Sequence, residues 1–124
     1  MLRFLDHLVD YVTSVSSPGA YGELARAALP SSPHAACAIL PLDEDASALP
    51  LRRLSFRLLV RDSSTAAAAA RAQALHSLFA RTWVSSPAFA GYFACSSFPK
   101  RADLKAELPI LQADYLFHTV SVTP

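Results

Sequence analysis

The most regular pattern in the chain lies between residues 51 and 61, where apolar and polar side chains alternate. This period of two residues predicts a β-strand with one face in a core and the other in solvent or against a partner. The predicted core face consists of Leu54, Phe56, Leu58 and Val60, and arginines occupy most of the other face.

A helix is predicted directly after this strand, from about Ser64 to Arg81. The polar residues at 62–65 are good N-caps, and the alanine-rich run that follows has high helix propensity. The side of this helix expected to face the core is narrow in its first half and bulky in its second, so its first half can approach a sheet closely. That side consists of Ala68, Ala72, Leu75, Leu78, Phe79 and, at its end, Trp83.

A second helix is predicted at the N-terminus, from Met1 to about Ser16. Its apolar residues recur at spacings of three and four, which is typical of a helix lying against a sheet. They are Leu2, Leu5, Leu8, Val9, Val12 and Val15. After this helix, residues 21–29 fit either a short helix or a loop, because Gly22 and Pro30 interrupt the segment.

The other predicted strands are residues 36–42, 89–98 and 111–122. Pro41 suits a sheet edge or a bulge, and Gly91 suits a bulge. Residues 43–50 are predicted to form a loop with an acidic tip, after which the strand at 51–61 returns antiparallel. Residues 99–110 form a connection that has room for a short strand at 103–108. These elements predict an α+β fold in one domain, residues 1–124, with a mostly antiparallel sheet of about four strands and two helices packed on it.

Composition adds an expectation about partners. Hydrophobic residues make up 52% of the 124 residues and charged residues 17%, against about 25% in typical soluble domains. Such a low charge density indicates that other subunits cover some of the apolar surface. The formal net charge of +1 favours neither nucleic acid nor an anionic membrane as a partner. No apolar stretch approaches the roughly 20 residues of a membrane span, and the N-terminus lacks the features of a signal peptide, so the sequence predicts no membrane association.

The sequence contains no catalytic motif, and we expect neither an enzyme nor a bound cofactor. A nucleophile elbow and a glycine-rich phosphate loop are both absent. Cys37 and Cys95 are interpreted as reduced buried residues, with a disulfide as the alternative. A zinc site would need the fold to bring these cysteines together with His34 and His118, and we expect no metal. The acidic run at 43–45 is interpreted as solvated rather than as a cation site.

One polar feature of the sequence is a candidate interaction surface. Arg53, Arg57 and Arg61 share one face of the predicted strand, and we call them the arginine row. Such a row either faces solvent or pairs with carboxylates of a neighbouring subunit, and the low charge density favours the subunit contact. Nucleic acid is the weaker alternative, since no aromatic residues alternate with these arginines in the sequence. The candidate partners across a subunit boundary are Asp43, Glu44, Asp45, Asp103 and Glu107.

Three stretches of the chain carry a family resemblance: MLRFLDHLVDYV at the N-terminus, RRLSFRLLVRDSSTAAAAARAQALHSLF at 52–79, and YLFHTVSV at 115–122. Together they resemble the tail-terminator and minor-capsid family of long-tailed bacteriophages and related prophage elements. In that family a strand with alternating apolar residues leads through a short polar turn into an alanine-rich helix. The chain departs from the family before its last strand, where it has PKRADLKAELPI in place of a turn similar to GRDxxGR.

The resemblance implies a structural virion protein without enzymatic activity. Members form a ring, commonly a homohexamer, that ends the tail tube and joins it to the head. The implied partners are further copies of the chain, the tail tube protein and a neck or head-completion protein. The genome passes through the lumen without sequence-specific binding. The implied location is the virion, after assembly in the host cytoplasm. The alternatives are a head–tail connector of similar size and a small oligomeric α+β domain that binds a ligand or has a regulatory role.

Overall fold

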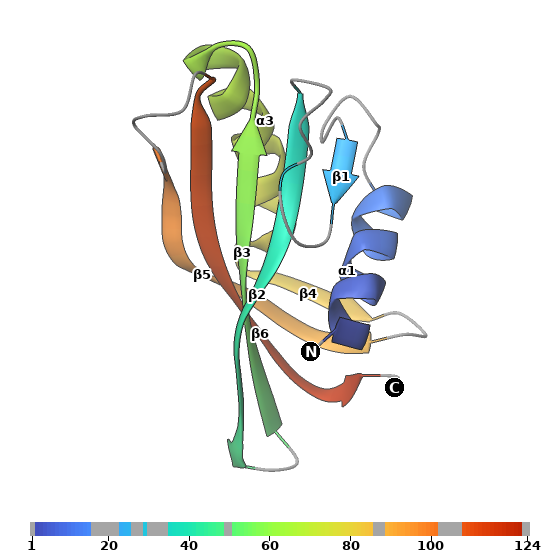
Figure 1. Cartoon of the computed structure of the whole chain (residues 1–124). Helices are drawn as coiled ribbons and strands as arrows, with labels where there is room; N and C mark the ends of the chain where they lie inside the picture. Colours follow the sequence, from blue (N-terminus) through green and yellow to red (C-terminus); the bar gives the residue numbers. More distant parts are fainter. Residues whose placement is uncertain are drawn as a thin grey trace.

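The computed structural model describes residues 2–15, 23–25, 29, 35–48, 51–85, 89–101 and 108–122, and these residues form two helices and six strands. Figure 1 shows their arrangement. The elements are α1 (Leu2–Val15), β1 (Glu23–Ala25), β2 (Ala36–Ala48), β3 (Leu51–Arg61), α3 (Thr65–Phe79), β4 (Thr82–Ser85), β5 (Phe89–Arg101) and β6 (Ile110–Val122).

The strands form one sheet in the order β1-β2-β3-β6-β5-β4. All neighbouring pairs are antiparallel except β1 and β2, which are parallel over three residues. The predicted α+β class with a mostly antiparallel sheet and two packed helices is therefore confirmed. The sheet also has two short strands that the sequence pattern did not predict, β1 and β4. At residues 23–25 the alternative of a short helix is wrong, because this segment pairs with the start of β2.

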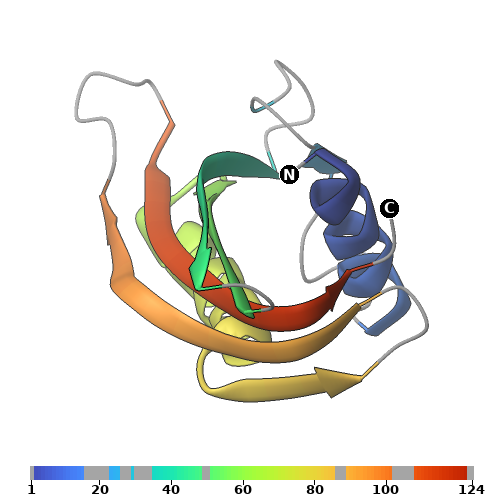
Figure 2. The same ribbon diagram turned by 90° about the horizontal axis from the view of Figure 1, so that it is seen from below.

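Both helices cover the same face of the sheet, and the sheet curves around them (Figure 2). The alternation in β3 is as predicted: Leu54, Phe56, Leu58 and Val60 are buried, and the residues between them are partly exposed. These side chains join residues of α1, α3, β5 and β6 in one core. The concave face of the sheet is therefore the core face, and the convex face remains for contacts outside the chain.

Aromatic rings fill the space between the helices and the concave face. Phe93 and Phe117 lie on adjacent strands with ring centroids 4.5 Å apart, and Phe4 of α1 stacks on Phe117 at 5.2 Å. Phe79 of α3 meets Phe56 of β3 edge-on at 5.3 Å. Such pairs stabilise a core by about 0.5–1.5 kcal/mol beyond the burial of their area. These rings hold α1 and α3 to the same part of the sheet.

The start of α3 matches the sequence prediction, and its end does not. The side chain of Ser64 caps the helix by accepting the Ala67 amide at 3.1 Å. The buried positions include Ala68, Ala72, Leu75 and Phe79, as expected. Trp83 was expected on this side of the helix and instead lies in β4, where it is 79% exposed. The helix ends earlier because Ala80 adopts an extended conformation and Arg81 a left-handed one (φ 55°), which turns the chain into a new strand.

The prediction of a loop at 43–50 is wrong over most of its length, because β2 continues to Ala48. The register shifts after Pro41 and after Asp45, and β2 stays paired with β3 across both shifts. Leu42 is the unpaired residue at the first shift. Pro41 therefore lies beside a bulge, as predicted. A polar strand at a sheet edge has the same composition as a loop, which explains the error. The candidate residues Asp103 and Glu107, the alternative strand at 103–108 and His34 lie outside the described residues.

Candidate interaction surface on the convex face of the sheet

The arginine row lies on the convex face, and its central member is paired within the chain. Arg57 and Asp114 are directly opposite each other on β3 and β6. The guanidinium donates through Nε to Oδ1 at 2.8 Å and through a terminal nitrogen to Oδ2 at 3.1 Å. This bidentate pair raises the pKa of Arg57, chiefly through the hydrogen bonds to Asp114. Asp114 is not among the carboxylates that the sequence suggested as partners of this row.

The other two arginines flank this pair along β3. Arg53 lies between Asp45 on β2 and His118 on β6, and Arg61 lies between Ala36 and Ile110. Asp43 is opposite Ser55, so Asp43 and Asp45 share the convex face with the arginine row. The structure thus places two of the predicted acidic residues near the row within one chain. Their pairing across a subunit boundary stays a prediction.

Glu44 belongs to the other face of β2, where it pairs with Arg52 of β3. The Arg52 Nε donates to the Glu44 carboxylate at 2.8 Å, and a second guanidinium nitrogen also contacts the same oxygen. The hydrogen bond from Arg52 lowers the pKa of Glu44. Since both side chains are 30% exposed, the pair contributes little to stability. Glu44 is therefore separated from the arginine row.

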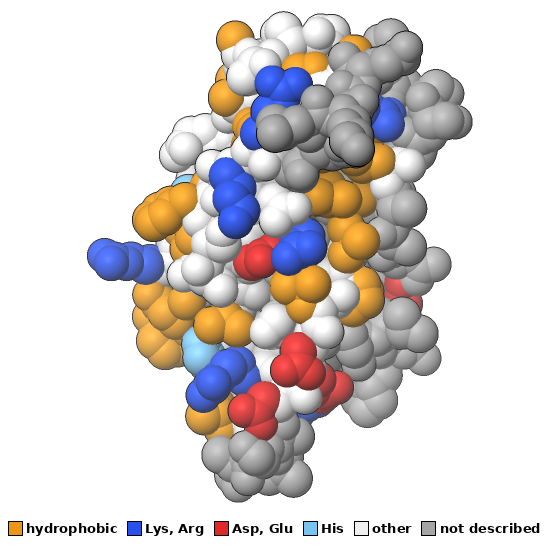
Figure 3. Space-filling view, turned by 60° about the vertical axis from the view of Figure 1, so that its left-hand side comes forward, with side chains coloured by type: hydrophobic (Ala, Val, Ile, Leu, Met, Phe, Trp, Pro, Cys, Tyr) orange, Lys and Arg blue, Asp and Glu red, His pale blue; other side chains and the backbone are white. Residues whose placement is uncertain are grey.

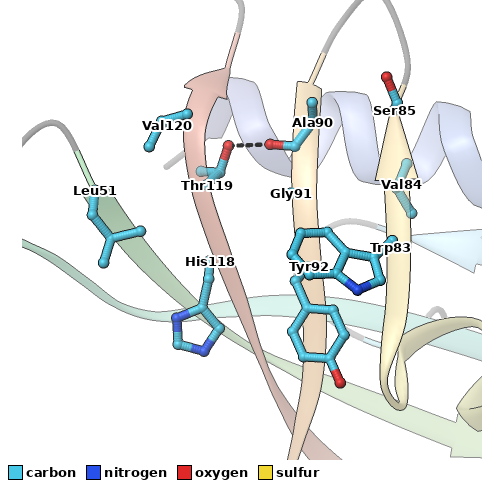
Figure 4. Close-up of a pocket in the computed structure, with 10 residues that line it drawn as sticks. All are labelled: Leu51, Trp83, Val84, Ser85, Ala90, Gly91, Tyr92, His118, Thr119 and Val120. Atoms are coloured by element: carbon cyan, nitrogen blue, oxygen red, sulfur yellow. Dashed lines mark hydrogen bonds between the residues drawn. The ribbon is translucent and has the colours of Figure 1, made fainter.

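Next to the arginine row, the convex face holds an apolar groove of about 550 Å³. Its lining comes from the adjacent strands β3, β6, β5 and β4 (Figure 4). None of the described residues that line it is acidic. The lining residues are Leu51, Trp83, Val84, Ser85, Ala90, Gly91, Tyr92, His118, Thr119 and Val120. We call this the Trp83 groove.

A bulge in β6 shapes the Trp83 groove. Gly91 pairs with Thr119 and Ala90 with Ser121, so Val120 is the extra residue. Gly91 was predicted at a bulge and does lie at one, although the extra residue belongs to the partner strand. The Thr119 hydroxyl donates to the Ala90 carbonyl at 2.5 Å and closes the irregularity (Figure 4). Val120 is 66% exposed, as expected where a bulge reorients a side chain.

The aromatic wall of the groove comes from a row of directly opposed residues. Trp83 lies opposite Tyr92, Tyr92 opposite His118, and His118 opposite Arg53. The rings of Trp83 and Tyr92 are 4.8 Å apart, and both are drawn together at the front of Figure 4. The Arg53 end of this row joins the groove to the arginine row. In Figure 3, hydrophobic side chains gather beside a histidine, with basic and acidic side chains below it.

Sequence reasoning missed this surface. Its residues lie in four separate segments, 51, 83–85, 90–92 and 118–120, and only the register of the strands brings them together. Along β3 itself, no aromatic residue shares the face of the arginine row, since Phe56 points into the core. In space, Trp83 and Tyr92 continue the row that begins at Arg53 on neighbouring strands. The one signal in the sequence was the isolated Trp83 just after a helix. The same pattern is expected for a Trp that is buried at the end of a helix, so it did not indicate a surface.

Polar groups on the concave face serve the packing of α3. The His76 ring lies 2.7 Å from the Tyr115 hydroxyl, through its Nδ1, and both side chains are buried. Asp62 accepts the Ser63 amide at 2.7 Å and Arg71 at 3.0 Å. The Ser63 hydrogen bond, followed by the pairing with Arg71, lowers the pKa of Asp62. These contacts fix α3 on the sheet.

The two cysteines are free thiols on separate strands. Cys37 lies in β2 and Cys95 in β5, with β3 and β6 between them. Burial raises the pKa of the Cys37 thiol to about 12, so this side chain is an inert part of the core. Among the described residues no three His, Cys, Asp or Glu side chains gather in a way that could hold a metal ion. Neither described helix has the length and apolar character needed to cross a bilayer.

Comparison with solved structures finds a chain of the same architecture in a virus-like particle. That structure is described as "Virion of native gene transfer agent (GTA) particle". The alignment has a TM-score of 0.63, covers 90% of each chain and has 17% sequence identity. The likeness shows a shared fold. No protein-family model matches the chain, and no curated protein does.

Proposed function

We propose that this chain is a structural virion protein of a phage-like particle, without enzymatic activity. The observation that carries the proposal is the fold likeness over 90% of both chains to a component of a gene transfer agent virion. The match extends over nearly the whole of both chains, so it concerns the fold as a whole rather than one shared segment. The resemblance of the N-terminal helix, the β3–α3 unit and β6 to the tail-terminator family points independently to the same class of protein.

Within this class, the proposed role is that of a tail terminator. Copies of the chain form a closed ring, a homohexamer by the family resemblance. The ring ends the tail tube and binds a neck or head-completion protein on its other side. The genome passes through the lumen without sequence-specific contacts. The chain would then be part of the finished virion, and it would be present in the host cytoplasm during assembly.

The distribution of exposed residues supports an assembly role. Trp83, Val120 and Leu51 are 79%, 66% and 40% exposed, and all three line one groove. Contiguous exposed apolar surface of this kind marks protein interaction sites, and Trp, Tyr and Arg are enriched in interfaces. The convex face has all three residue types in adjacent positions. A protein that buries this face in an assembly also explains why 17% charged residues suffice for solubility.

Light scattering after size exclusion, together with negative-stain images, tests the proposal. The expected result is a ring of several copies, and a monomer at all accessible concentrations would contradict it. Adding the purified chain to isolated tail tubes and, separately, to isolated heads distinguishes two roles. A tail terminator binds the tube end, whereas a head–tail connector binds only the head.

The alternative of a small ligand-binding domain also has an observation in its favour. The groove volume of about 550 Å³ lies within the range of small-molecule sites, which is roughly 300–1,000 Å³. Such sites bury most of their ligand, however, and Trp83 leaves most of its surface in solvent. A thermal-shift screen with small aromatic and apolar compounds tests this alternative. Stabilisation by one compound class that Trp83→Ala abolishes would favour it over assembly.

A further inference from the structure

The lining of the Trp83 groove and the charges beside it restrict what can fill it. Its lining is almost entirely apolar, so its occupant must present an apolar side chain. Two cations lie next to its lining residues: Arg53 stands opposite His118, and Arg81 lines a neighbouring hollow together with Tyr92. Both arginines are exposed. An apolar side chain with carboxylates directly beside it is complementary to such a groove.

The chain itself carries a segment of this composition. At residues 41–45 the sequence is Pro-Leu-Asp-Glu-Asp, and all five residues are exposed. This is the only run of consecutive acidic residues in the described part of the chain. Leu42 is 45% exposed, although it is a large apolar residue within a strand. The adjacent Asp43 carboxylate accepts the Glu44 amide at 2.9 Å, so it is held beside Leu42.

The bulge at Leu42 presents this segment to solvent. Pro41 pairs with Phe56 and Asp43 with Ser55, so Leu42 has no opposite residue on β3. Among the described strands, β1 pairs only with residues 36–38 of β2, which leaves the outer edge of β2 from Leu40 onward without a described strand partner. Figure 1 shows this part of β2 extending beyond β1. We call residues 41–45 the Leu42 bulge.

We infer that the Trp83 groove of one copy receives the Leu42 bulge of a second copy. Leu42 enters the apolar groove, and the Asp43 carboxylate directly beside it meets the positive charge at the border of the groove. This inference rests on the proposed ring, and it names the two surfaces that would build it. Groove and bulge have no residue in common, since β2 carries the bulge and the strands from β3 to β4 carry the groove, and they adjoin where Asp45 lies opposite Arg53. A contact between two different surfaces is head-to-tail, which is the type that generates rings.

Two variants and one control test the inference. Trp83→Ala removes the principal groove side chain, and Leu42→Asp would place a charge in the groove. Trp83 and Leu42 are exposed in one chain, so both variants are expected to fold. Val15→Ser changes an exposed apolar residue of α1, 50% exposed, that belongs to neither surface. We expect each test variant alone to weaken assembly at least about tenfold, as for a central interface residue, and the control to form the wild-type ring.

Mixing the two test variants gives the decisive result. The Leu42→Asp protein keeps an intact groove, and the Trp83→Ala protein keeps an intact bulge. Only one productive contact is then available to each molecule, so an equimolar mixture should form heterodimers and nothing larger. The chain has a single tryptophan, and Trp83→Ala removes it. Fluorescence of the mixture therefore comes only from the intact groove, and its emission should shift to shorter wavelength as Trp83 becomes buried.

The outcomes separate this inference from the proposed function. Wild-type rings that persist in Trp83→Ala or Leu42→Asp would overturn the inference and leave the ring proposal standing. A wild-type protein that stays monomeric would overturn both. Titrating the Leu42→Asp protein with single-stranded oligothymidine provides a further control. Quenching of Trp83 by the oligonucleotide, without a fluorescence shift in the protein mixture, would make the groove a nucleic-acid surface and overturn the inference.

Discussion

Arg57 and Asp114, which are 57 residues apart in sequence, form a bidentate ion pair between β3 and β6. The two side chains are 35% and 20% exposed, so the pair lies at the surface of the convex face. Because this pair lies in the middle of the arginine row, the row has both a structural role within the chain and an exposed surface. It links two central strands of one chain, and it remains exposed enough to meet a neighbour.

Reversing this pair tests the arginine row as an assembly surface. Arg57→Glu places two carboxylates opposite each other and should cost about 1–2 kcal/mol of unfolding free energy. The double variant Arg57→Glu/Asp114→Arg restores the pair and should recover most of that stability. If the row contacts carboxylates of a neighbouring copy, the double variant still assembles more weakly, as light scattering would show. A wild-type oligomer mass in the double variant would count against a role of Arg57 in assembly.

The Asp62–Arg71 pair should contribute more to stability than the Arg52–Glu44 pair. Its side chains are only 13% and 14% exposed, and Asp62 also accepts the Ser63 amide. We expect Asp62→Ala to cost about 1–3 kcal/mol, because it leaves buried polar groups without this acceptor. Glu44→Ala, which removes a more exposed carboxylate, should cost about 1 kcal/mol or less. Urea denaturation at pH 7 measures both, and equal costs would contradict the expectation.

The same pair should make stability depend on pH in one direction. The pKa of Asp62 is lower in the folded chain than its ordinary value of about 3.9. The ionised form therefore stabilises the fold at all pH values above that ordinary value. This contribution is lost as the pH falls through the lowered pKa of the folded state. The difference in unfolding free energy between wild type and Asp62→Ala should thus be constant from pH 5 to 7 and shrink below about pH 4.

Gly91 should not tolerate a side chain. A Cβ at this position would lie 2.2 Å from the backbone oxygen of His118 and 2.7 Å from the Phe117 ring. Because a backbone oxygen in a paired strand cannot move aside, Gly91→Ala should cost about 1–3 kcal/mol and distort the groove. Ser96→Ala, an exposed change on the same strand, should stay within about 0.5 kcal/mol. Thermal unfolding of both variants compares them, and an unchanged midpoint for Gly91→Ala would refute the close approach.

The narrow half of α3 gives a matched pair of variants. Ala72 is 2% exposed against the sheet, whereas Ala69 is exposed on the opposite side. Ala72→Leu should overpack the site and cost about 1–3 kcal/mol. Ala69→Leu should be nearly neutral, because leucine is also a good helix former. Chemical denaturation of the two variants tests the orientation of the helix, and similar stabilities would show that α3 does not approach the sheet at Ala72.

The long periodic elements could be predicted from the sequence, because their own side chains determine which face is buried. The alternation at Leu54, Phe56 and Leu58 predicted β3, and the cap and alanine run predicted the start of α3. Short strands carry no such period. β1 has three residues and β4 has four, and both form because a longer neighbour offers them hydrogen bonds. The polar end of β2 had the composition of a loop.

The Trp83 groove was beyond sequence analysis for a related reason. Trp83 was placed in the buried side of a helix because it follows Phe79 at helical spacing. Its real position depends on the left-handed Arg81, which no local pattern indicated. The arginine row was visible in the sequence, whereas its partner Asp114 was not, because register between β3 and β6 is set by the whole sheet.

The place of β6 in the sheet has a consequence for how the chain folds during synthesis. β6 is the last described strand along the chain, yet it lies between β3 and β5 in the centre of the sheet. Until the ribosome has made it, β1-β2-β3 and β4-β5 cannot join, and the aromatic core lacks Tyr115 and Phe117. Pairing over such sequence distances is slow compared with local contacts. Nascent chains are therefore expected to remain protease-sensitive until β6 has left the ribosome, and to become protected in a single late step.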